Sequence, residues 1–376
     1  MGETQSRGDV ALIGCGYVAD LYMRSLKAHP GIRVLGAHDR DAARQKAFCA
    51  HWGIPELPDA PAACAALPAD GLVLNLTNPK SHETVIRGCL RAGRHVWSEK
   101  PVVLDLETAR GLHDLARARG LQLASAPSSV LSQASQGLGR ALRLGVGGTP
   151  RLIYAELDEG FLPQAPYKDW ISESGAPWPA EDEFRTGCTL EHAGYWLSWL
   201  IAHLGPVRRV VAASAEVIPD KPGLRHAAPD FSVAALFFES GPVARLTCSI
   251  AAPHDHRLRV VGDEGVIEVP RAWDNFAPVR LRRRLRLRRR LIESPIARDL
   301  SLKGQHQPRP GRRGSAAMDF ALGPAEMLAA IAAGRDSRLA GDYALHLTEV
   351  TLAIQEGAAR DMTTRCAPME PMPWAA

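Results

Sequence analysis

The sequence lacks a long hydrophobic run and a strong excess of charge of either sign. No apolar stretch approaches the roughly 20 residues that a membrane-spanning helix needs, and the N-terminal MGETQSRGDV is polar where a signal peptide is hydrophobic. The net charge is only +4 over 376 residues, which gives no general attraction to nucleic acid. We therefore expect a cytoplasmic protein that binds neither membranes nor nucleic acid.

The cysteines also lack any paired spacing. There are seven, an odd number, scattered without CxxC or Cys/His ligand patterns, and this argues against a disulfide framework and against a zinc site. We expect reduced, mostly buried thiols and no metal.

The length and the order of apolar segments predict two domains. A chain of 376 residues exceeds the size at which one hydrophobic core stops growing. Residues 1–127 alternate strand-like runs with amphipathic helical stretches, as in a βαβ sheet with helical crossovers. This predicts an α/β domain with a Rossmann-type, doubly wound parallel sheet. The expected strands are 9–13, 32–38, 71–76, 95–97 and 121–124, and the expected helices are 17–28, 41–52, 81–92 and 105–119.

The rhythm changes after residue 127. Helical patterns near 130–145 and 187–204 precede alternating runs separated by turn signals such as ESGP and GDEG. Residues 128–376 are therefore expected to form an α+β domain with a large, mostly antiparallel open sheet. The open face of a sheet this size commonly pairs with its copy, so we expect this domain to join subunits. Helices after residue 321 close the chain and are expected to pack back on the first domain. The expected strands are 207–217, 230–238, 243–252, 256–262 and 264–270.

The segment 279–291, VRLRRRLRLRRRL, holds eight arginines. Nucleic-acid binding is one interpretation. The segment has no interleaved aromatic residues and the chain has no DNA-binding motif, so we interpret it as an exposed strand or sheet edge with solvated arginines.

A glycine motif follows the first expected strand. Residues 14–19, Gly-Cys-Gly-Tyr-Val-Ala, fit G-x-G-x-x-A, in which the glycines permit a tight turn and close approach of a pyrophosphate to a helix N-terminus. We predict that Gly14, Gly16, Tyr17 and Val18 contact a dinucleotide.

Asp39 ends the second expected strand, twenty residues after Ala19. A carboxylate there accepts hydrogen bonds from the ribose hydroxyls and repels a 2′-phosphate, which favours NAD. The neighbouring Arg40 could instead meet that phosphate, so NADP stays open. The structural alternative for Asp39 is capping of the next helix. Thr77, Asn78 and His82 follow the third strand at the edge where ligands of such sheets bind, and we predict that they border the cofactor.

Three groups of residues together resemble the Gfo/Idh/MocA family of glucose–fructose oxidoreductase, inositol dehydrogenase and relatives. They are the glycine loop with Thr77-Asn78-Pro79 and His82, the sequence Glu99-Lys100-Pro101, and Arg338-Leu339 with Asp342 and 344–346. The resemblance implies an NAD(P)-dependent enzyme acting on sugars or polyols, a homodimer or homotetramer, a lysine beside the nicotinamide and a proline that is often cis. Glu99 and Lys100 are therefore assigned to the cofactor site. Lys100 also suits hydrogen bonding to a substrate oxygen that gains charge during hydride transfer.

The stretch 189–200, TLEHAGYWLSWL, departs from the resemblance. The family usually carries Asp-x-Gly-x-His with a second Asp three residues on. Alignment on Gly194 puts His192 at the first Asp, Trp196 at the histidine and Trp199 at the second Asp. The expected proton carrier is missing.

His192 and Tyr195 remain as candidates for the proton and for substrate binding. The pKa of an ordinary histidine suits proton transfer in either direction near neutral pH, and a nearby Lys100 would lower the pKa of Tyr195. Both side chains could instead be satisfied polar groups in the core.

The long segment 158–185 combines aromatic and charged residues suited to a sugar. We assign substrate contacts there to Asp158, Lys168, Trp170 and Arg185. The sequence thus predicts an NAD(P)-dependent oxidoreductase acting on a carbohydrate-like alcohol or ketone. The alternatives are a catalytically silent cofactor-sensing protein of the same fold, and a glycoside-cleaving enzyme that uses NAD transiently.

Overall fold

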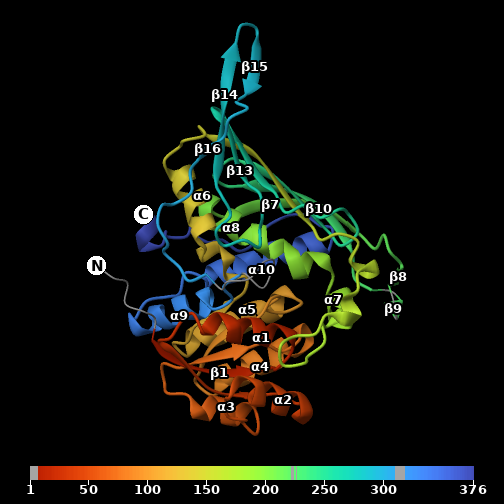
Figure 1. Ribbon diagram of the computed structural model, residues 1–376, viewed down its shortest axis with the longest axis vertical. Coiled ribbons are helices and arrows are strands. Elements are labelled where there is room, and N and C mark those ends of the chain that lie inside the picture. Colours follow the sequence, from red (N-terminus) through yellow and green to blue (C-terminus); the bar gives the residue numbers. More distant parts are fainter. Residues whose placement is uncertain (1–6, 222–223, 226, 310–317) are drawn as a thin grey trace. The chain divides into compact units, whose positions relative to one another are not determined.

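The computed structural model describes residues 7–221, 224–225, 227–309 and 318–376, and the chain divides into two compact units. The first unit contains the chain up to Ser128, Ala165–Thr186 and Asp319–Thr348. The second contains Ser129–Gln164, Gly187–Met318 and Glu349–Ala376. In Figure 1 the chain is coloured along the sequence, so the segments of each unit can be found by their colour.

The first unit is built on a five-stranded parallel sheet in the order β2-β1-β3-β4-β5. The central position of β1 and β3 brings the ends of both strands to one edge, where ligands of doubly wound sheets bind. The predicted α/β fold is confirmed. The strands are β1 (Gly8–Ile13), β2 (Ile32–His38), β3 (Leu72–Asn75), β4 (His95–Ser98) and β5 (Leu123–Ser125).

Three helices of this unit begin at aspartate caps. Asp41, Asp59 and Asp105 each accept backbone N–H groups of the first turn, which satisfies donors that have no partner within the helix. The short α3, sequence APAACAA, was not predicted, because it has no polar face to give a helical period. The helices are α1 (Tyr17–Leu26), α2 (Ala42–Trp52), α3 (Ala60–Ala66), α4 (Pro79–Arg91) and α5 (Leu106–Ala118).

Two later segments belong to the same unit. Helix α9 (Leu322–Ala332) lies against β3 and β4, and a Cβ added at Gly323 would meet the Trp97 ring at 2.0 Å. Glycine is therefore needed for this close packing. Residues 165–186 contain η3 (Tyr167–Asp169) and α7 (Ala180–Thr186). Helix α10 (Asp342–Gln355) follows α9, and only its residues up to Thr348 belong to this unit.

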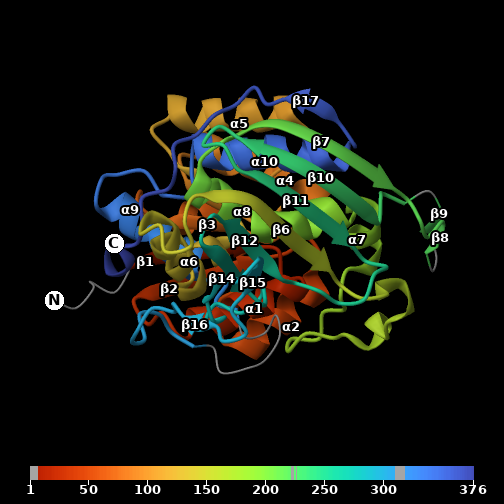
Figure 2. The ribbon, with the colours of Figure 1, turned by 90° about the horizontal axis from the view of Figure 1, so that it is seen from above.

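The second unit is built on a large sheet in the order β15-β14-β13-β12-β6-β11-β10-β7-β17, with β16 on β14. Figure 2 shows several of these strands side by side. Pairing is antiparallel except between β6 and β11, so the predicted, mostly antiparallel sheet is confirmed. The strands are β6 (Pro150–Asp158), β7 (Val207–Ala215), β10 (Phe231–Phe238), β11 (Val243–Ser249), β12 (Leu258–Gly262), β13 (Gly265–Val269), β14 (Arg280–Leu287), β15 (Arg290–Glu293), β16 (Arg298–Asp299) and β17 (Ala359–Asp361), with a separate pair β8 (Asp220–Lys221) and β9 (Leu224–Arg225).

The central strand β6 was not predicted. Its sequence PRLIYAELD begins with proline, and its first residues are exposed while its last are buried, so the clean alternation of a half-buried strand is missing. Both neighbours of β6 come about 90 residues or more later in the chain.

The helices of the second unit are α6 (Gln133–Arg143) and α8 (Gly194–Leu204). The expected helix over 187–204 differs at its start, because Thr189–Ala193 form a π turn before α8. Short 3₁₀ turns lie at Ser128–Leu131, Leu162–Gln164 and Pro373–Ala375. Within the residues that the structure describes, no helix combines the length and the apolar character needed to cross a membrane.

The arginine-rich segment forms β14 and the hairpin partner β15. The distal residues of β14 and all four residues of β15 are exposed, and the hairpin projects beyond the rest of its sheet in Figure 1. This confirms the interpretation of the segment as an exposed strand.

Candidate functional site

The glycine loop leaves the end of β1 in a conformation that requires glycine. Gly14 has φ +103°, and a Cβ there would lie 2.6 Å from backbone atoms of Leu76. At Gly16, the N-cap of α1, an added Cβ would meet nothing within 4 Å in the described part of the chain. The start of α1 therefore offers room and backbone donors to a phosphate group. These residues fit the pyrophosphate of a dinucleotide.

Asp39 joins the end of β2 to this loop. Its Oδ2 accepts the backbone N–H of Cys15 at 2.8 Å and its Oδ1 accepts that of Asp41 at 2.9 Å. Asp41 is the residue that caps α2, so the alternative role of Asp39 as that helix cap is wrong. Each carboxylate oxygen retains acceptor capacity for a ribose hydroxyl. Arg40 is exposed.

Hydrogen bonds tie together the segments that follow β3 and β4. Asn75 donates to the Ser98 hydroxyl at 3.0 Å and accepts from the Thr77 hydroxyl at 2.7 Å. The fully buried His82 reaches the carbonyl of Thr77 at 2.9 Å and that of Pro101 at 2.6 Å. His82 therefore positions the loop around Lys100. The Lys100–Pro101 peptide bond is cis.

The Glu99 carboxylate is held by hydrogen bonds from a buried tyrosine, which is itself held by a tryptophan. Its Oε1 accepts the Tyr22 hydroxyl at 2.7 Å, and the Tyr22 oxygen accepts Trp97 Nε1–H at 2.8 Å. Its Oε2 accepts the backbone N–H of Lys100 at 3.1 Å. A buried, fully engaged carboxylate fixes the backbone from which the Lys100 side chain leaves.

The three remaining site candidates of the first unit lie in 165–186. Trp170 packs against Trp178, with ring centroids 5.2 Å apart, while Lys168 is exposed. Arg185 is exposed and donates to Glu181 at 2.8 Å. Asn78 donates to Asp182 at 3.2 Å, so this segment contacts the loop that follows β3.

In the second unit, His192 in the π turn and Tyr195 at the start of α8 both pack against the indole of Trp273. The Trp273 ring lies 6.1 Å from that of His192 and 5.7 Å from that of Tyr195. Trp196 and Trp199 are fully buried and donate to the Glu156 carbonyl and the Ser129 hydroxyl, respectively. The positions that align with the family histidine and second aspartate therefore hold structural tryptophans.

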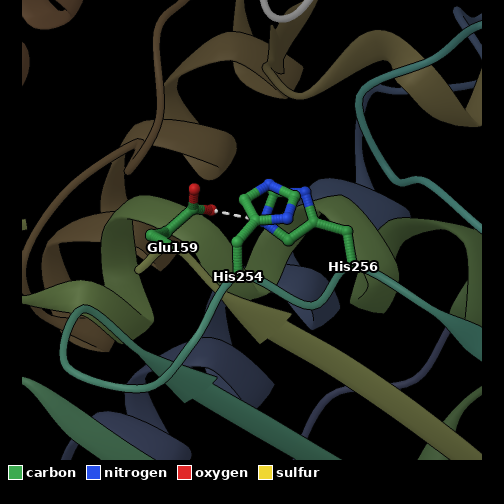
Figure 3. Close-up of side chains that lie close together, drawn as sticks. All are labelled: Glu159, His254 and His256. Carbon is green, nitrogen blue, oxygen red and sulfur yellow. Dashed lines mark ion pairs between the residues drawn. The ribbon is translucent and has the colours of Figure 1, made fainter. Parts of the chain in front are cut away.

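His192 also meets a buried carboxylate. Its Nδ1 lies 3.3 Å from Glu159 Oε1, and His256 Nε2 lies 3.0 Å from the same oxygen. The ring of His254 is tilted against that of His256, with ring centroids 4.1 Å apart (Figure 3). Burial raises the pKa of Glu159, but the nearby His192, His256 and His254 outweigh this and hold it below its usual value. The carboxylate is therefore ionised.

The neighbouring Asp158 behaves in the opposite way. Burial, with the charges of Glu156 and Asp255, raises its pKa to about 6. Two adjacent carboxyls thus differ in proton affinity, because three histidines lower the pKa of Glu159 whereas His256 alone opposes the rise at Asp158.

Backbone pairing explains how these side chains meet. Asp158 and Asp255 exchange backbone hydrogen bonds of 3.0 and 2.9 Å, which extends β6 beside residues 254–256. Glu159, His254, His256 and Trp273 were not predicted as site residues, because the segments that carry them are far apart in the chain. The available signal was His-x-His at 254–256, since alternate residues of an extended segment share a side.

Two family models match the chain. Residues 9–126 match the model described as "Oxidoreductase family, NAD-binding Rossmann fold", and residues 136–268 match the GFO/IDH/MocA C-terminal domain. The chain belongs to the GFO/IDH/MocA family. This GFO/IDH/MocA protein is therefore an NAD(P)-dependent oxidoreductase of a family with sugar-related members, and the recognition from the sequence is confirmed.

Relatives of this GFO/IDH/MocA protein include the D-apiose dehydrogenase of Paraburkholderia graminis, 27% identical over 71% of this chain and 68% of the relative. An inositol dehydrogenase homologue of Azotobacter vinelandii, solved with NADH and myo-inositol, has a TM-score of 0.73 at 14% identity and covers 95% and 97% of the two chains. A variant of a 3-ketoreductase of Actinomadura kijaniata, solved with TDP-benzene and NADP, has a TM-score of 0.71 at 20% identity over 94% and 98%. At these identities the structural matches show the fold.

Proposed function

We propose that the protein transfers a hydride between NAD and a sugar, a polyol or a sugar-derived ketone. The observation that carries the proposal is Lys100, whose backbone is held by Glu99 and whose loop is tied by His82 to the edge of the sheet that carries the glycine motif. The nicotinamide supplies the chemistry of accepting or giving a hydride. The names of the relatives support a carbohydrate-like substrate.

In the first unit, Gly14, Gly16, Tyr17 and Val18 border the dinucleotide, and Asp39 binds the ribose. Its negative charge favours NAD over NADP, while Arg40 keeps some tolerance for NADP. Lys100 holds the reacting oxygen of the substrate and stabilises the charge that develops on it. Thr77, Asn78 and His82 shape this site. Lys168, Trp170 and Arg185 are proposed as substrate contacts from their segment.

In the second unit, His192 takes or gives the hydroxyl proton. The ionised Glu159, 3.3 Å from His192 Nδ1, orients the ring and stabilises the imidazolium that forms. Tyr195 beside the same Trp273 is the second candidate, and Asp158 is proposed as a substrate contact. Leu152 and Val211, each more than 40% exposed on the sheet, support a homodimer or homotetramer.

Incubation with NAD and a panel of sugars and polyols tests the function. Nicotinamide absorbance and released sugar are followed together. Net reduction of NAD supports the proposal. Cleavage of a glycoside without net reduction would instead indicate the glycoside-cleaving alternative, and tight NAD binding with neither signal would indicate a silent cofactor sensor.

Replacement of His192 by alanine is expected to lower kcat about 100-fold or more, because general acid–base catalysis contributes about 10²–10⁴-fold. Tyr195→Phe removes only a hydroxyl and is expected to lower kcat less than about tenfold. The effect is small because the carboxylate that supports proton transfer, Glu159, lies beside His192. Steady-state kinetics across pH measure both, and the acidic limb of the profile should disappear only in His192→Ala. A larger loss for Tyr195→Phe would transfer the proton role to Tyr195.

A further inference from the structure

The side chains around Glu159 form a compact cluster within the second unit. One ligand atom each of Glu159, His254 and His256 lies within 4.8 Å of the other two. Figure 3 shows both imidazoles beside the carboxylate. His256 and the side chain of Glu159 are buried, at 3% and 6% exposure, whereas His254 opens to solvent. The cluster is thus closed on one side and accessible on the other.

The contacts in this cluster do not form a good hydrogen-bond network. Glu159 Oε1 and His256 Nε2 lie 3.0 Å apart, yet neither atom has a hydrogen bond of good geometry to the described residues. Buried polar atoms are normally hydrogen-bonded, so each exception needs an explanation. A single ionised carboxylate also balances only one positive imidazolium, and a second buried charge would be costly. Neutral imidazoles, by contrast, offer lone pairs to a cation.

The separation of two of these ligand atoms is close to that of ligands around one ion. Ligand atoms about 2.0–2.1 Å from a tetrahedral zinc ion lie roughly 3.3 Å from one another. The observed 3.0 Å between Glu159 Oε1 and His256 Nε2 is close to this value. Two histidines with one carboxylate suit zinc and other divalent first-row metals, and three protein ligands leave a position open.

We propose that Glu159, His254 and His256 bind a divalent transition-metal ion, with Zn²⁺ as its best representative. The structure brings the ligands together through the pairing of Asp158 with Asp255, which places the ends of β6 and the 254–256 segment side by side. The open position accepts an oxygen donor. That this donor is a hydroxyl or carbonyl of the substrate rests on the proposed function, whereas binding of the metal itself does not.

Calorimetric titration of the chelator-treated full chain with Zn²⁺ tests the site. We expect one Zn²⁺ per chain and release of protons from the imidazoles, seen as a dependence of the heat on the buffer. Glu159→Gln and His256→Asn should each weaken Zn²⁺ binding at least about tenfold. The matched control is Glu156→Gln, three residues earlier on β6, whose carboxylate pairs with Arg245. His51→Asn serves as a control histidine from the other unit.

Titration with Co²⁺ gives a second readout, because visible absorption bands report coordination by imidazole and carboxylate. These bands should appear in the unmodified protein and in both controls, and should be lost or altered in the two ligand variants. Absence of stoichiometric Zn²⁺ binding, or equal affinity in all variants, would overturn the metal site. Calorimetry with NAD on the same samples tests the proposed function separately, and circular dichroism verifies that each variant is folded.

Discussion

Replacing Lys100 by alanine is expected to lower kcat about a thousandfold while leaving the Kd for NAD nearly unchanged. The expected loss reflects removal of a charged donor aimed at an oxygen that gains charge in the transition state, for which single donors contribute about 10²–10³-fold, with positioning adding to this. The Kd for NAD should remain nearly unchanged, because the positions of Asp39 and the glycine loop do not depend on the Lys100 side chain. Steady-state nicotinamide absorbance measures kcat, and calorimetry measures the Kd.

Lys80→Ala is the matched control, because Lys80 is an exposed lysine at the start of α4 in the same unit. It should retain normal turnover. Lys100→Arg keeps the charge but has a different donor geometry, and it should recover little activity. Unchanged turnover in Lys100→Ala would remove this residue from the mechanism.

Replacing Asp39 by alanine is expected to weaken NAD binding about 100-fold and NADP binding by roughly tenfold. Hydrogen bonds to a charged acceptor contribute about 1.5–3 kcal/mol, and the ribose hydroxyls of NAD lose this partner. Binding of both cofactors is also weakened because the glycine loop loses order when the hydrogen bond from the Cys15 N–H to Asp39 is removed. For NADP this loss of affinity is partly compensated, because the Asp39 carboxylate no longer repels the 2′-phosphate. The ratio of the two Kd values is therefore the decisive measurement.

Asp41→Ala is the control for Asp39. It removes the cap of α2 and should lower stability by about 1 kcal/mol without changing the ratio of the NAD and NADP affinities. If Asp39→Ala weakens both cofactors equally, the assignment of Asp39 to the ribose fails.

Local patterns in the sequence predicted the first unit well. Each βα step there carries its own signal, such as the VALI run before Gly14 or the apolar strand before Asp39, and most consecutive strands pair in the sheet. The same reasoning identified the Gfo/Idh/MocA resemblance from Glu99, Lys100 and Pro101, and the family models confirm it.

The second unit was harder to predict, because the contacts that build its sheet and its histidine cluster join residues far apart in the sequence. β6 was missed since its burial changes along its length, and the cluster of Glu159 with His256 depends on strands almost 100 residues apart. The cysteine-based expectation of no metal site considered only sequence spacing. The π turn at Thr189–Ala193 also places His192 outside α8, which a helical wheel through 187–204 does not show.

The central place of β6 has a consequence for how the chain folds. Leu152 pairs with Val243 and also with Val261, so β6 has no neighbour in its sheet until a chain segment of about 90 residues has been brought back. Closing such a long loop costs entropy before any pairing repays it, and high contact order slows folding. The middle of the second sheet should therefore assemble late, and Glu159 can meet His254 and His256 only after that step.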